Sequence, residues 1–288
     1  MTARPRRSAL YLPASNRRAI EKARTLSCDV VILDLEDAVA PEAKDEARHN
    51  ALEAVRDGGF GPRELVVRAN GGGNAWAAAD LAALAGSGAG SGVGAVLIPK
   101  VSGPGDLRRA RAALGEGPAL WAMIETPRAI LDLPAIAEAA AETGLACLVA
   151  GGNDLAKDLR ARPDAARTPL IPALSMIVVA ARAAGIAALD GVCNTIEDAD
   201  VVGAEARQGL MLGFDGKTLI HPAQIAPANR VFTPTPDEVA WARKVDAAFE
   251  APEHAGKGAI RLDGKMVELL HRDEARRVLA IAAACGVA

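Results

Sequence analysis

The chain has 288 residues, a formal net charge of −3 and no long run of like charge. These features give no basis for nucleic acid or an anionic membrane as a main partner, so a small-molecule substrate is expected. No apolar stretch is long enough to span a bilayer, and residues 1–13 lack the length and cleavage signal of a secretory peptide.

Half of the residues are hydrophobic but only 3% are aromatic, so Ala, Val, Leu and Ile must fill the core. Small and branched side chains suit buried parallel strands and their covering helices, which favours an α/β fold over an all-β sandwich. The four cysteines lie far apart without paired spacing. We therefore expect free thiols and a cytoplasmic location.

Short apolar runs alternate with Ala-rich, charged stretches of helical spacing from Arg7 to Arg230. Eight strands are predicted, at Ser8–Leu12, Val30–Leu33, Leu65–Arg68, Ala95–Ile98, Ala119–Ile124, Ala146–Ala150, Ala187–Asp190 and Lys217–Ile220. Helices are predicted at Arg17–Leu26, Glu42–Arg56, Trp76–Leu84, Asp106–Leu114, Arg128–Ala141, Ile171–Ala184, Ala199–Gly209 and Ala223–Val231. Eight βα units with short connections predict a closed (β/α)8 TIM barrel over residues 1–233.

Residues 234–288 lie outside the eight-unit count and are predicted to form a C-terminal helical extension. This segment contains, in order, Pro234, Pro236, a helix at Asp237–Ala251, a strand at Ala259–Leu262 and a helix beginning near Asp273. We expect it to close one end of the barrel or to reach a neighbouring subunit. The Gly-rich stretch Gly86–Gly94 precedes a strand, so it is predicted to be a flexible connector without a phosphate-binding role.

Active-site residues of such barrels lie at the carboxyl ends of the strands. Polar residues follow the second to the sixth predicted strand, namely Asp34, Glu36 and Asp37, then Arg68 and Asn70, then Lys100, then Glu125 and Thr126, then Asn153 and Asp154. We expect these side chains to converge on one site. Arg17, Arg18 and Lys22 near the barrel mouth are candidates for binding coenzyme phosphates, with plain solvation as the alternative.

Glu125 and Asp154 are the predicted metal ligands. Each is a lone carboxylate at the mouth of an adjacent strand, and Mg²⁺ takes one or two carboxylates with water and substrate oxygens completing its octahedral shell. The alternative is that each carboxylate caps the helix that follows it. The neighbouring cations Arg68 and Lys100 favour the metal interpretation. The four histidines lack zinc-ligand spacing.

Arg68 is predicted to hold a substrate carboxylate or an enolate oxygen beside the metal. Glu36, Asp37 and Lys100 are assigned with it to substrate binding. The alternative for Glu36 and Asp37 is a salt bridge to Arg68 that only orders the barrel mouth. Lys100 could be a charge partner, a structural ion pair or a Schiff-base nucleophile, and the Schiff base ranks last because a metal already supplies an electron sink.

Several motifs resemble those of the citrate lyase β-subunit-like proteins in the HpcH/HpaI aldolase superfamily, which includes malyl-CoA, citramalyl-CoA and β-methylmalyl-CoA lyases. The motifs, in chain order, are Arg7 with Ser8, Leu10–Pro13, Val31–Val39, Val67–Asn70, Pro99 to Val101, Ile124 to Thr126, and Gly213–Pro222. The resemblance implies Mg²⁺ at Glu125 and Asp154, and Arg68 on the substrate carboxylate and carbonyl. It also implies a homo-oligomer, often a trimer, whose C-terminal segment covers a neighbour's active site.

The chain departs from the family pattern at three places. Glu268 stands where the family has an aspartate that acts across the subunit interface, and Leu269 and Leu270 replace the proline that usually follows. Ala14 stands where a glycine is usual, in a loop expected near the coenzyme. Asn153 replaces the glutamate that commonly precedes the metal-binding aspartate. Glu268 is nevertheless predicted to be a catalytic residue for proton transfer.

The resemblance implies a Mg²⁺-dependent carbon–carbon lyase. Its substrate would be a 3-hydroxyacyl-CoA such as malyl-CoA or citramalyl-CoA, cleaved into acetyl-CoA and an α-keto acid. Three alternatives stay open: a malyl-CoA thioesterase using the same metal site, an aldolase for free hydroxy-keto acids, and a subunit of a citrate lyase complex.

Overall fold

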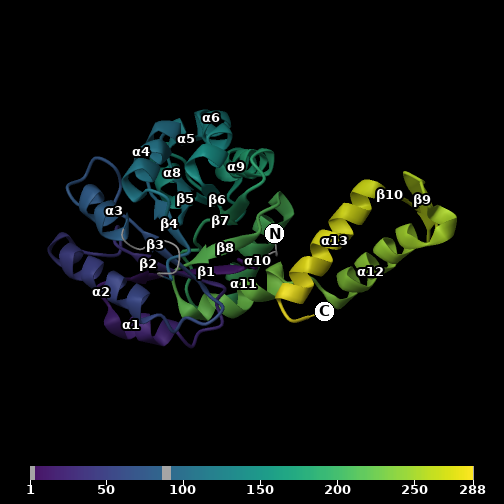
Figure 1. Cartoon of the computed structure of the whole chain (residues 1–288), viewed down its shortest axis with the longest axis horizontal. Helices are drawn as coiled ribbons and strands as arrows, with labels where there is room; N and C mark the ends of the chain where they lie inside the picture. The colour runs from purple at the N-terminus through teal and green to yellow at the C-terminus, as the bar shows by residue number, and fades with distance from the viewer. Residues whose placement is uncertain (1–3, 86–91, 288) are drawn as a thin grey trace. The chain divides into compact units, whose positions relative to one another are not determined.

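The computed structural model describes residues 4–85 and 92–287. The chain divides into two compact units, one of Arg6–Asn229 and one formed mainly by the chain from Arg230 onward. The first unit contains strands β1 to β8 with helices around them, and the second contains two long helices and a hairpin (Figure 1). Most of the predicted Gly-rich connector falls on residues 86–91, which lie outside the described residues.

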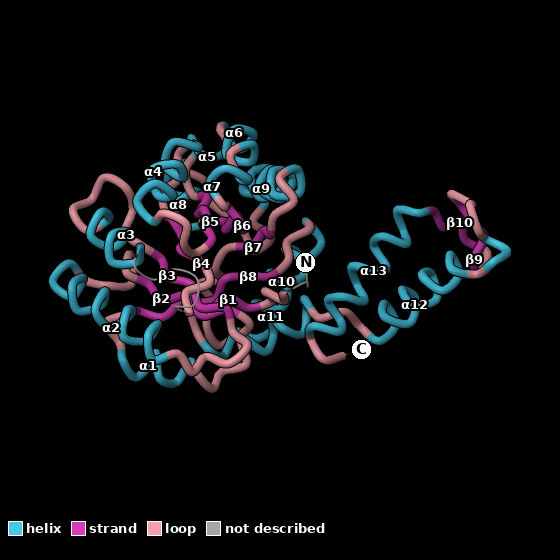
Figure 2. The backbone as a smooth tube through the Cα atoms, viewed as in Figure 1, coloured by secondary structure: helices cyan, strands magenta, loops and turns pink. Residues whose placement is uncertain are grey.

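Eight parallel strands close into a barrel in sequence order, and β8 pairs back to β1. The strands are β1 (Ser8–Pro13), β2 (Val30–Asp34), β3 (Glu64–Arg68), β4 (Ala95–Ile98), β5 (Ala119–Ile124), β6 (Leu145–Ala150), β7 (Ala187–Asp190) and β8 (Gly216–Leu219). Figure 2 shows these strands in magenta inside a layer of helices. The predicted TIM barrel is confirmed.

Side chains that alternate along the strands fill the barrel interior. Ile32, Val66, Leu97, Trp121 and Cys147 belong to one cluster and are fully buried. The interior is therefore a packed apolar core. The polar groups that line the pocket lie in the layer at the carboxyl ends of the strands.

The helices of the barrel unit follow the predicted order with differences at their ends. They are α1 (Arg17–Ala23), α2 (Lys44–Asp57), α3 (Ala77–Ala85), α4 (Pro104–Leu114), α5 (Pro127–Leu131), α6 (Leu133–Glu138), α7 (Ala140–Thr143), α8 (Gly152–Asp158), α9 (Ile171–Ala183), α10 (Ala199–Leu212) and α11 (Ile225–Phe232). The single helix predicted at Arg128–Ala141 is wrong. Three short helices stand there, and Pro134 in the first turn of α6 separates α5 from α6 because it has no N–H to continue the preceding helix.

The C-terminal unit is built from α12 (Pro236–Glu250), α13 (Leu269–Ala284) and an antiparallel hairpin of β9 (Ala259–Leu262) and β10 (Lys265–Glu268). Asp263 and Gly264 connect the two strands with positive φ angles of 49° and 77°, as a two-residue hairpin turn of type I′ requires. α13 begins four residues before the predicted Asp273. Within the described ranges, no helix is both long and apolar enough to cross a membrane.

Candidate active site

A pocket of about 300 Å³ opens at the carboxyl ends of the barrel strands. Of the predicted site residues, Asp37, Arg68, Glu125 and Asp154 line it. Glu36 and Lys100 contact these residues from the adjoining loops. Tyr11, Met123, Gly151 and Ile220 are among the other lining residues. The site residues predicted at the carboxyl ends of the barrel strands therefore lie close together in the structure.

Arg68 is held in place by Asp34, which is fully buried. Arg68 Nε and Nη2 each donate to an Asp34 carboxylate oxygen at 2.6 Å, because the register of β2 and β3 sets Asp34 directly opposite Arg68. The guanidinium carbon also lies 4.8 Å from the centre of the Tyr11 ring. Burial alone would lower the pKa of Arg68, but the hydrogen bonds and charge of Asp34 raise it above its ordinary value. This guanidinium is fixed and fully charged.

The third nitrogen of Arg68, Nη1, is the one that Asp34 leaves free for other groups. It lies 3.1 Å from Glu36 Oε2 and 3.5 Å from Asp37 Oδ2. Glu36 is buried, and burial is the main cause that raises its pKa to about 8. The side chain of Asp37 is 59% exposed. The predicted salt bridges of Glu36 and Asp37 to Arg68 are both present, but Asp34 is the main partner.

Glu125, Lys100 and Asp154 form a second cluster beside Arg68. The backbone N–H of Lys100 donates to Glu125 Oε1 at 2.7 Å, and Lys100 Nζ donates to Asp154 Oδ2 at 2.5 Å. Burial raises the pKa of Glu125 to about 7. Partial burial would raise the pKa of Asp154, but the hydrogen bond from Lys100 holds it below its ordinary value. Lys100 is thus the charge partner of both carboxylates.

Gly151 allows Glu125 to reach this position. A Cβ atom on Gly151 would lie 2.3 Å from Glu125 Cβ and 2.8 Å from Glu125 Oε2. Real Cβ atoms do not approach that closely, so a larger residue at the end of β6 would displace the carboxylate. The glycine at this strand end is therefore required by the site.

The charge and bonding of this cluster fit a divalent cation. Glu125 Oε2 is buried and has no hydrogen-bond partner in the part of the chain that the structure describes. Five carboxylates, Asp34, Glu36, Asp37, Glu125 and Asp154, surround two cations, Arg68 and Lys100. Residues 4–85 and 92–287 contain no group of three or more His, Cys, Asp or Glu side chains arranged to hold a metal. Mg²⁺ does not need one, because one or two carboxylates suffice.

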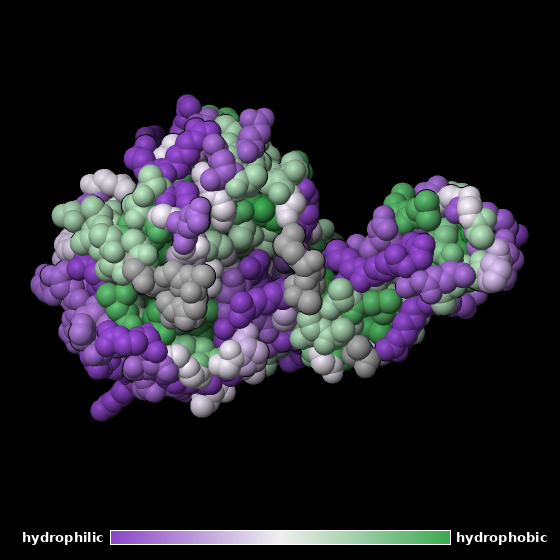
Figure 3. All heavy atoms as spheres, in the orientation of Figure 1, coloured by the Kyte–Doolittle hydropathy of each residue, from purple (hydrophilic) through white to green (hydrophobic). Residues whose placement is uncertain are grey.

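Glu268 lies in the C-terminal unit, as the last residue of β10 and the N-cap of α13. Its backbone N–H donates to His271 Nδ1 at 2.9 Å. Met266, Leu269 and Leu270 around it are 70%, 48% and 62% exposed, and the β10 end of this unit carries hydrophobic surface in Figure 3. The action of Glu268 across a subunit interface stays a prediction.

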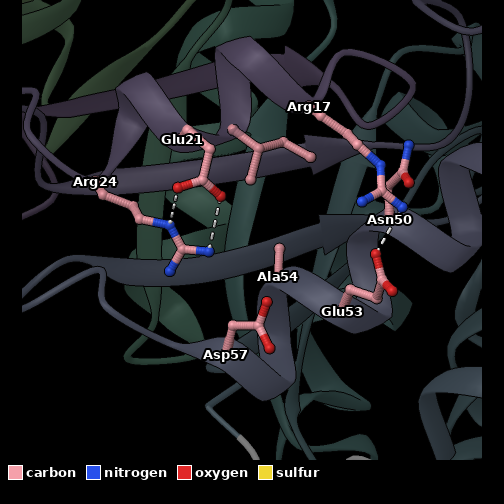
Figure 4. Close-up of a pocket in the computed structure, with 8 residues that line it drawn as sticks. Arg17, Glu21, Arg24, Asn50, Glu53, Ala54 and Asp57 are labelled. Atoms are coloured by element: carbon pink, nitrogen blue, oxygen red, sulfur yellow. Dashed lines mark hydrogen bonds and ion pairs between the residues drawn. The ribbon is translucent and has the colours of Figure 1, made fainter.

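A separate hollow lies between α1 and α2, lined by Arg17, Arg24, Glu21, Glu53 and Asp57 among others (Figure 4). Arg17 pairs with Glu53 at 2.7 Å, and Arg24 pairs with Glu21 at 3.1 Å. These carboxylates already neutralise the two arginines, and Asp57 adds a further negative charge. The hollow therefore does not favour a phosphate, which weakens the assignment of Arg17 to the coenzyme.

The sequence prediction missed Tyr11 as part of the site, and it missed the role of Asp34 as the main partner of Arg68. Asp34 was grouped with the carboxylates after β2, although its alternation with Val30 and Ile32 points to the barrel interior. Tyr11 alternates with Ala9 on β1 in the same way. Every second side chain of a strand faces the barrel interior. Continuing this alternation to the end of each strand identifies Asp34 and Tyr11 as inward-facing residues.

A parallel eight-stranded barrel with an acidic, arginine-containing pocket at the carboxyl ends of its strands defines a barrel enzyme. The sequence model of the HpcH/HpaI aldolase/citrate lyase family matches residues 7–222. The chain belongs to this family of enzymes, whose members include citramalyl-CoA lyases and citrate lyase β subunits. The resemblance found in the motifs is confirmed.

Three relatives illustrate the range of the family. A protein of Cereibacter sphaeroides named (3S)-malyl-CoA thioesterase is 46% identical over 284 residues, which cover 98% of this chain and 96% of that protein. Human mitochondrial citramalyl-CoA lyase is 31% identical over 96% of this chain and 86% of its own length. The structure of CitE from Mycobacterium tuberculosis with magnesium, acetoacetate and coenzyme A is 32% identical, with a TM-score of 0.76, covering 98% of this chain and all of that one.

Proposed function

We propose that this enzyme is a Mg²⁺-dependent thioesterase that hydrolyses a malyl-CoA type of 3-hydroxyacyl-CoA to the free hydroxy acid and coenzyme A. From the sequence alone, carbon–carbon cleavage is the first expectation and this hydrolysis is one of the alternatives. The reversal rests mainly on one observation, the 46% identity with (3S)-malyl-CoA thioesterase over nearly the full length of both chains. Glu268 stands where the resemblance implies an interface aspartate, which supports a change of chemistry on the same type of barrel site.

Glu125 and Asp154 are the proposed Mg²⁺ ligands, and this assignment is supported by the buried Glu125 Oε2, which accepts no hydrogen bond from the residues that the structure describes. Bound there, Mg²⁺ would supply a Lewis acid for a substrate oxygen and offset the excess of carboxylates. Arg68 is proposed to bind the substrate carboxylate through Nη1, since Asp34 occupies its other two nitrogens. Lys100 is proposed to release Asp154 and pair with a substrate oxygen instead. Its bond to Asp154 favours a charge partner over a Schiff-base nucleophile.

Hydrolysis adds water across the C–S bond, so the products are malate and the coenzyme A thiol. Lyase chemistry on the same substrate would instead give acetyl-CoA and glyoxylate. The test is product analysis with (3S)-malyl-CoA and Mg²⁺ in ¹⁸O-water. The proposal predicts free thiol and malate with one ¹⁸O in a carboxylate. Glyoxylate and acetyl-CoA in equal amounts, without labelled malate, would refute hydrolysis.

Carbon–carbon cleavage is the second candidate, because citramalyl-CoA lyase relatives share 31% identity over 96% of the chain. A variant that restores the aspartate of the family at position 268 tests whether this residue decides between hydrolysis and cleavage. If the longer side chain favours hydrolysis, Glu268→Asp should raise the ratio of keto acid to free thiol. An unchanged ratio would remove Glu268 from the explanation.

We also propose a cytoplasmic homo-oligomer, trimer or a multiple of it, in which residues 234–288 cover a neighbour's active site. The exposed apolar side chains of Met266, Leu269 and Leu270 around Glu268 support such a contact. The buried free thiols of Cys28, Cys147 and Cys193 support a reducing compartment. Co-expressing Arg68→Ala with Glu268→Ala tests the shared site, because mixed oligomers would contain some intact sites. Activity in the mixture but in neither variant alone is expected.

A further inference from the structure

Tyr11 carries a polar group that the folded chain does not use. The residue is 8% exposed and lines the active-site pocket. Its hydroxyl is buried and has no hydrogen-bond partner among the residues that the structure describes. Burial of a hydroxyl without a partner is destabilising, and phenylalanine would fill the same space without that cost. The hydroxyl is therefore better explained by a ligand than by the fold.

The surroundings of Tyr11 indicate which ligand atom it meets. Its ring packs on the Arg68 guanidinium, with the Arg68 Cζ atom 4.8 Å from the ring centre. Arg68 Nη1 is the nitrogen that Asp34 does not bind. Burial raises the pKa of Tyr11 above its ordinary value, so its hydroxyl keeps its proton and acts as a donor. Tyr11 and Arg68 thus bring two donors to one wall of the pocket, and a carboxylate is the acceptor that suits both.

We propose that the Tyr11 hydroxyl donates a hydrogen bond to the substrate carboxylate that Arg68 binds, and so helps to select carboxylate-bearing acyl groups. This inference rests on the proposed function for the identity of the substrate. It adds a residue on β1 to the groups that recognise the acid. The hydroxyl lowers the stability of the free enzyme and raises its affinity for the ligand.

The test is the binding of pyruvate in the presence of Mg²⁺, measured by calorimetry on wild type, Tyr11→Phe and Trp121→Phe. Tyr11→Phe keeps the ring on Arg68 and removes the hydroxyl alone. Its affinity for pyruvate should fall about tenfold, as for a hydrogen bond to a charged group. Its melting temperature should stay equal or rise. Trp121 Nε1 is another buried donor without a described partner, but Trp121 does not line the pocket, so Trp121→Phe should leave the affinity unchanged.

Acetyl-CoA, which has no free carboxylate, separates the carboxylate from the thioester carbonyl. Tyr11→Phe should bind acetyl-CoA as wild type does. Wild-type affinity of Tyr11→Phe for pyruvate, or a loss confined to acetyl-CoA, would overturn the proposal. If wild type binds pyruvate but does not hydrolyse malyl-CoA, the proposed function fails while these affinities still decide the role of Tyr11.

Tyr11 is the single tyrosine of the chain, so 3-fluorotyrosine labelling gives one ¹⁹F signal. Adding pyruvate and Mg²⁺ should shift that signal, whereas Mg²⁺ with acetyl-CoA should shift it less. This readout needs neither turnover nor a folded variant. An unmoved signal at saturating pyruvate would exclude contact between Tyr11 and the acid.

Discussion

Lys100 joins the two predicted metal ligands, because its ammonium group lies 2.5 Å from Asp154 Oδ2 while its backbone N–H lies 2.7 Å from Glu125 Oε1. Lys100 Nζ is also 3.5 Å from Glu125 Oε2. Lys100 adopts a left-handed backbone angle of φ 52°, which is uncommon for a residue with a side chain. The Lys100 ammonium group therefore lies where the metal ion is expected. Lys100 and the metal ion must compete for the carboxylates of Glu125 and Asp154.

Removing the Lys100 ammonium should tighten metal binding. Lys100→Met is expected to lower the dissociation constant for Mn²⁺ by roughly threefold to tenfold, a modest effect because the side chain is 36% exposed and screened by solvent. Turnover should fall at the same time. Mn²⁺ titration followed by electron paramagnetic resonance measures the affinity. Lys157→Met removes an exposed charge from the same region, and an equal effect there would rule out direct competition.

The Asp34 clamp on Arg68 should matter more than the exposed ion pair with Asp37. Asp34→Asn breaks a buried bidentate pair and is expected to destabilise the fold by about 3 kcal/mol or more. It should also lower kcat/KM at least about 100-fold, because Arg68 loses its orientation. Asp37→Asn should cost less than about 1 kcal/mol. Urea unfolding of both variants checks this order, and equal losses would contradict it.

Two adjacent glycines give a matched test of the space around Glu125. Gly151→Ala places a Cβ 2.3 Å from Glu125 Cβ, so about 1–3 kcal/mol of stability and most of the metal affinity should be lost. Gly152→Ala meets nothing closer than Leu170 Cδ1 at 3.8 Å. It should be neutral or slightly stabilising in the first turn of α8. Thermal unfolding with and without Mg²⁺ distinguishes the two, and similar curves would show that Gly151 does not set the position of Glu125.

A buried charge network at the start of β8 should make stability depend on pH. Lys217 Nζ lies 3.2 Å from Asp190 Oδ2, and Arg167 Nη1 lies 2.7 Å from Asp190 Oδ1. Burial would raise the pKa of Asp190, but these two cations hold it below its ordinary value. The ionised carboxylate therefore stabilises the fold at neutral pH, and this contribution is lost as pH falls from about 4 through the lower pKa of the folded state.

Asp190→Asn should cost about 3 kcal/mol at pH 7, and the difference from wild type should shrink as pH falls below about 4. Urea unfolding at a series of pH values measures this. Asp45→Asn removes a carboxylate whose side chain is 86% exposed and should change stability by less than about 0.5 kcal/mol at any pH. A constant difference for Asp190→Asn across the range would contradict the assignment.

The sequence predicts the barrel and most of its candidate site. Apolar runs mark the strands, and the polar residues that follow these runs mark the site. Glu125, Asp154 and Arg68 follow apolar runs, and closure of the barrel brings strand ends together. The choice of Asp34 as the main partner of Arg68 depends on the register between β2 and β3, which periodicity along one strand does not contain. The bond from Lys100 to Asp154 likewise depends on a side-chain conformation.

Helix boundaries were harder to predict than strands. The Ala-rich stretch after Glu125 has helical composition throughout, yet it forms three short helices, and Pro134 accounts for the break between the first two. α8 was missed because it begins at Gly152, a poor helix former, and spans seven residues. The role of Glu268 depends on how chains assemble, so it stays a prediction.

The most direct test of the central claim is metal-dependent hydrolysis of (3S)-malyl-CoA by wild type, Glu125→Gln and Asp154→Asn. Protein stripped with EDTA should release no thiol, and Mg²⁺ should restore hydrolysis to wild type. The two variants should keep the fold, bind Mn²⁺ at least about tenfold more weakly and regain little activity. Thiol release at the wild-type rate in EDTA, or by either variant, would contradict the proposed magnesium site and the function built on it.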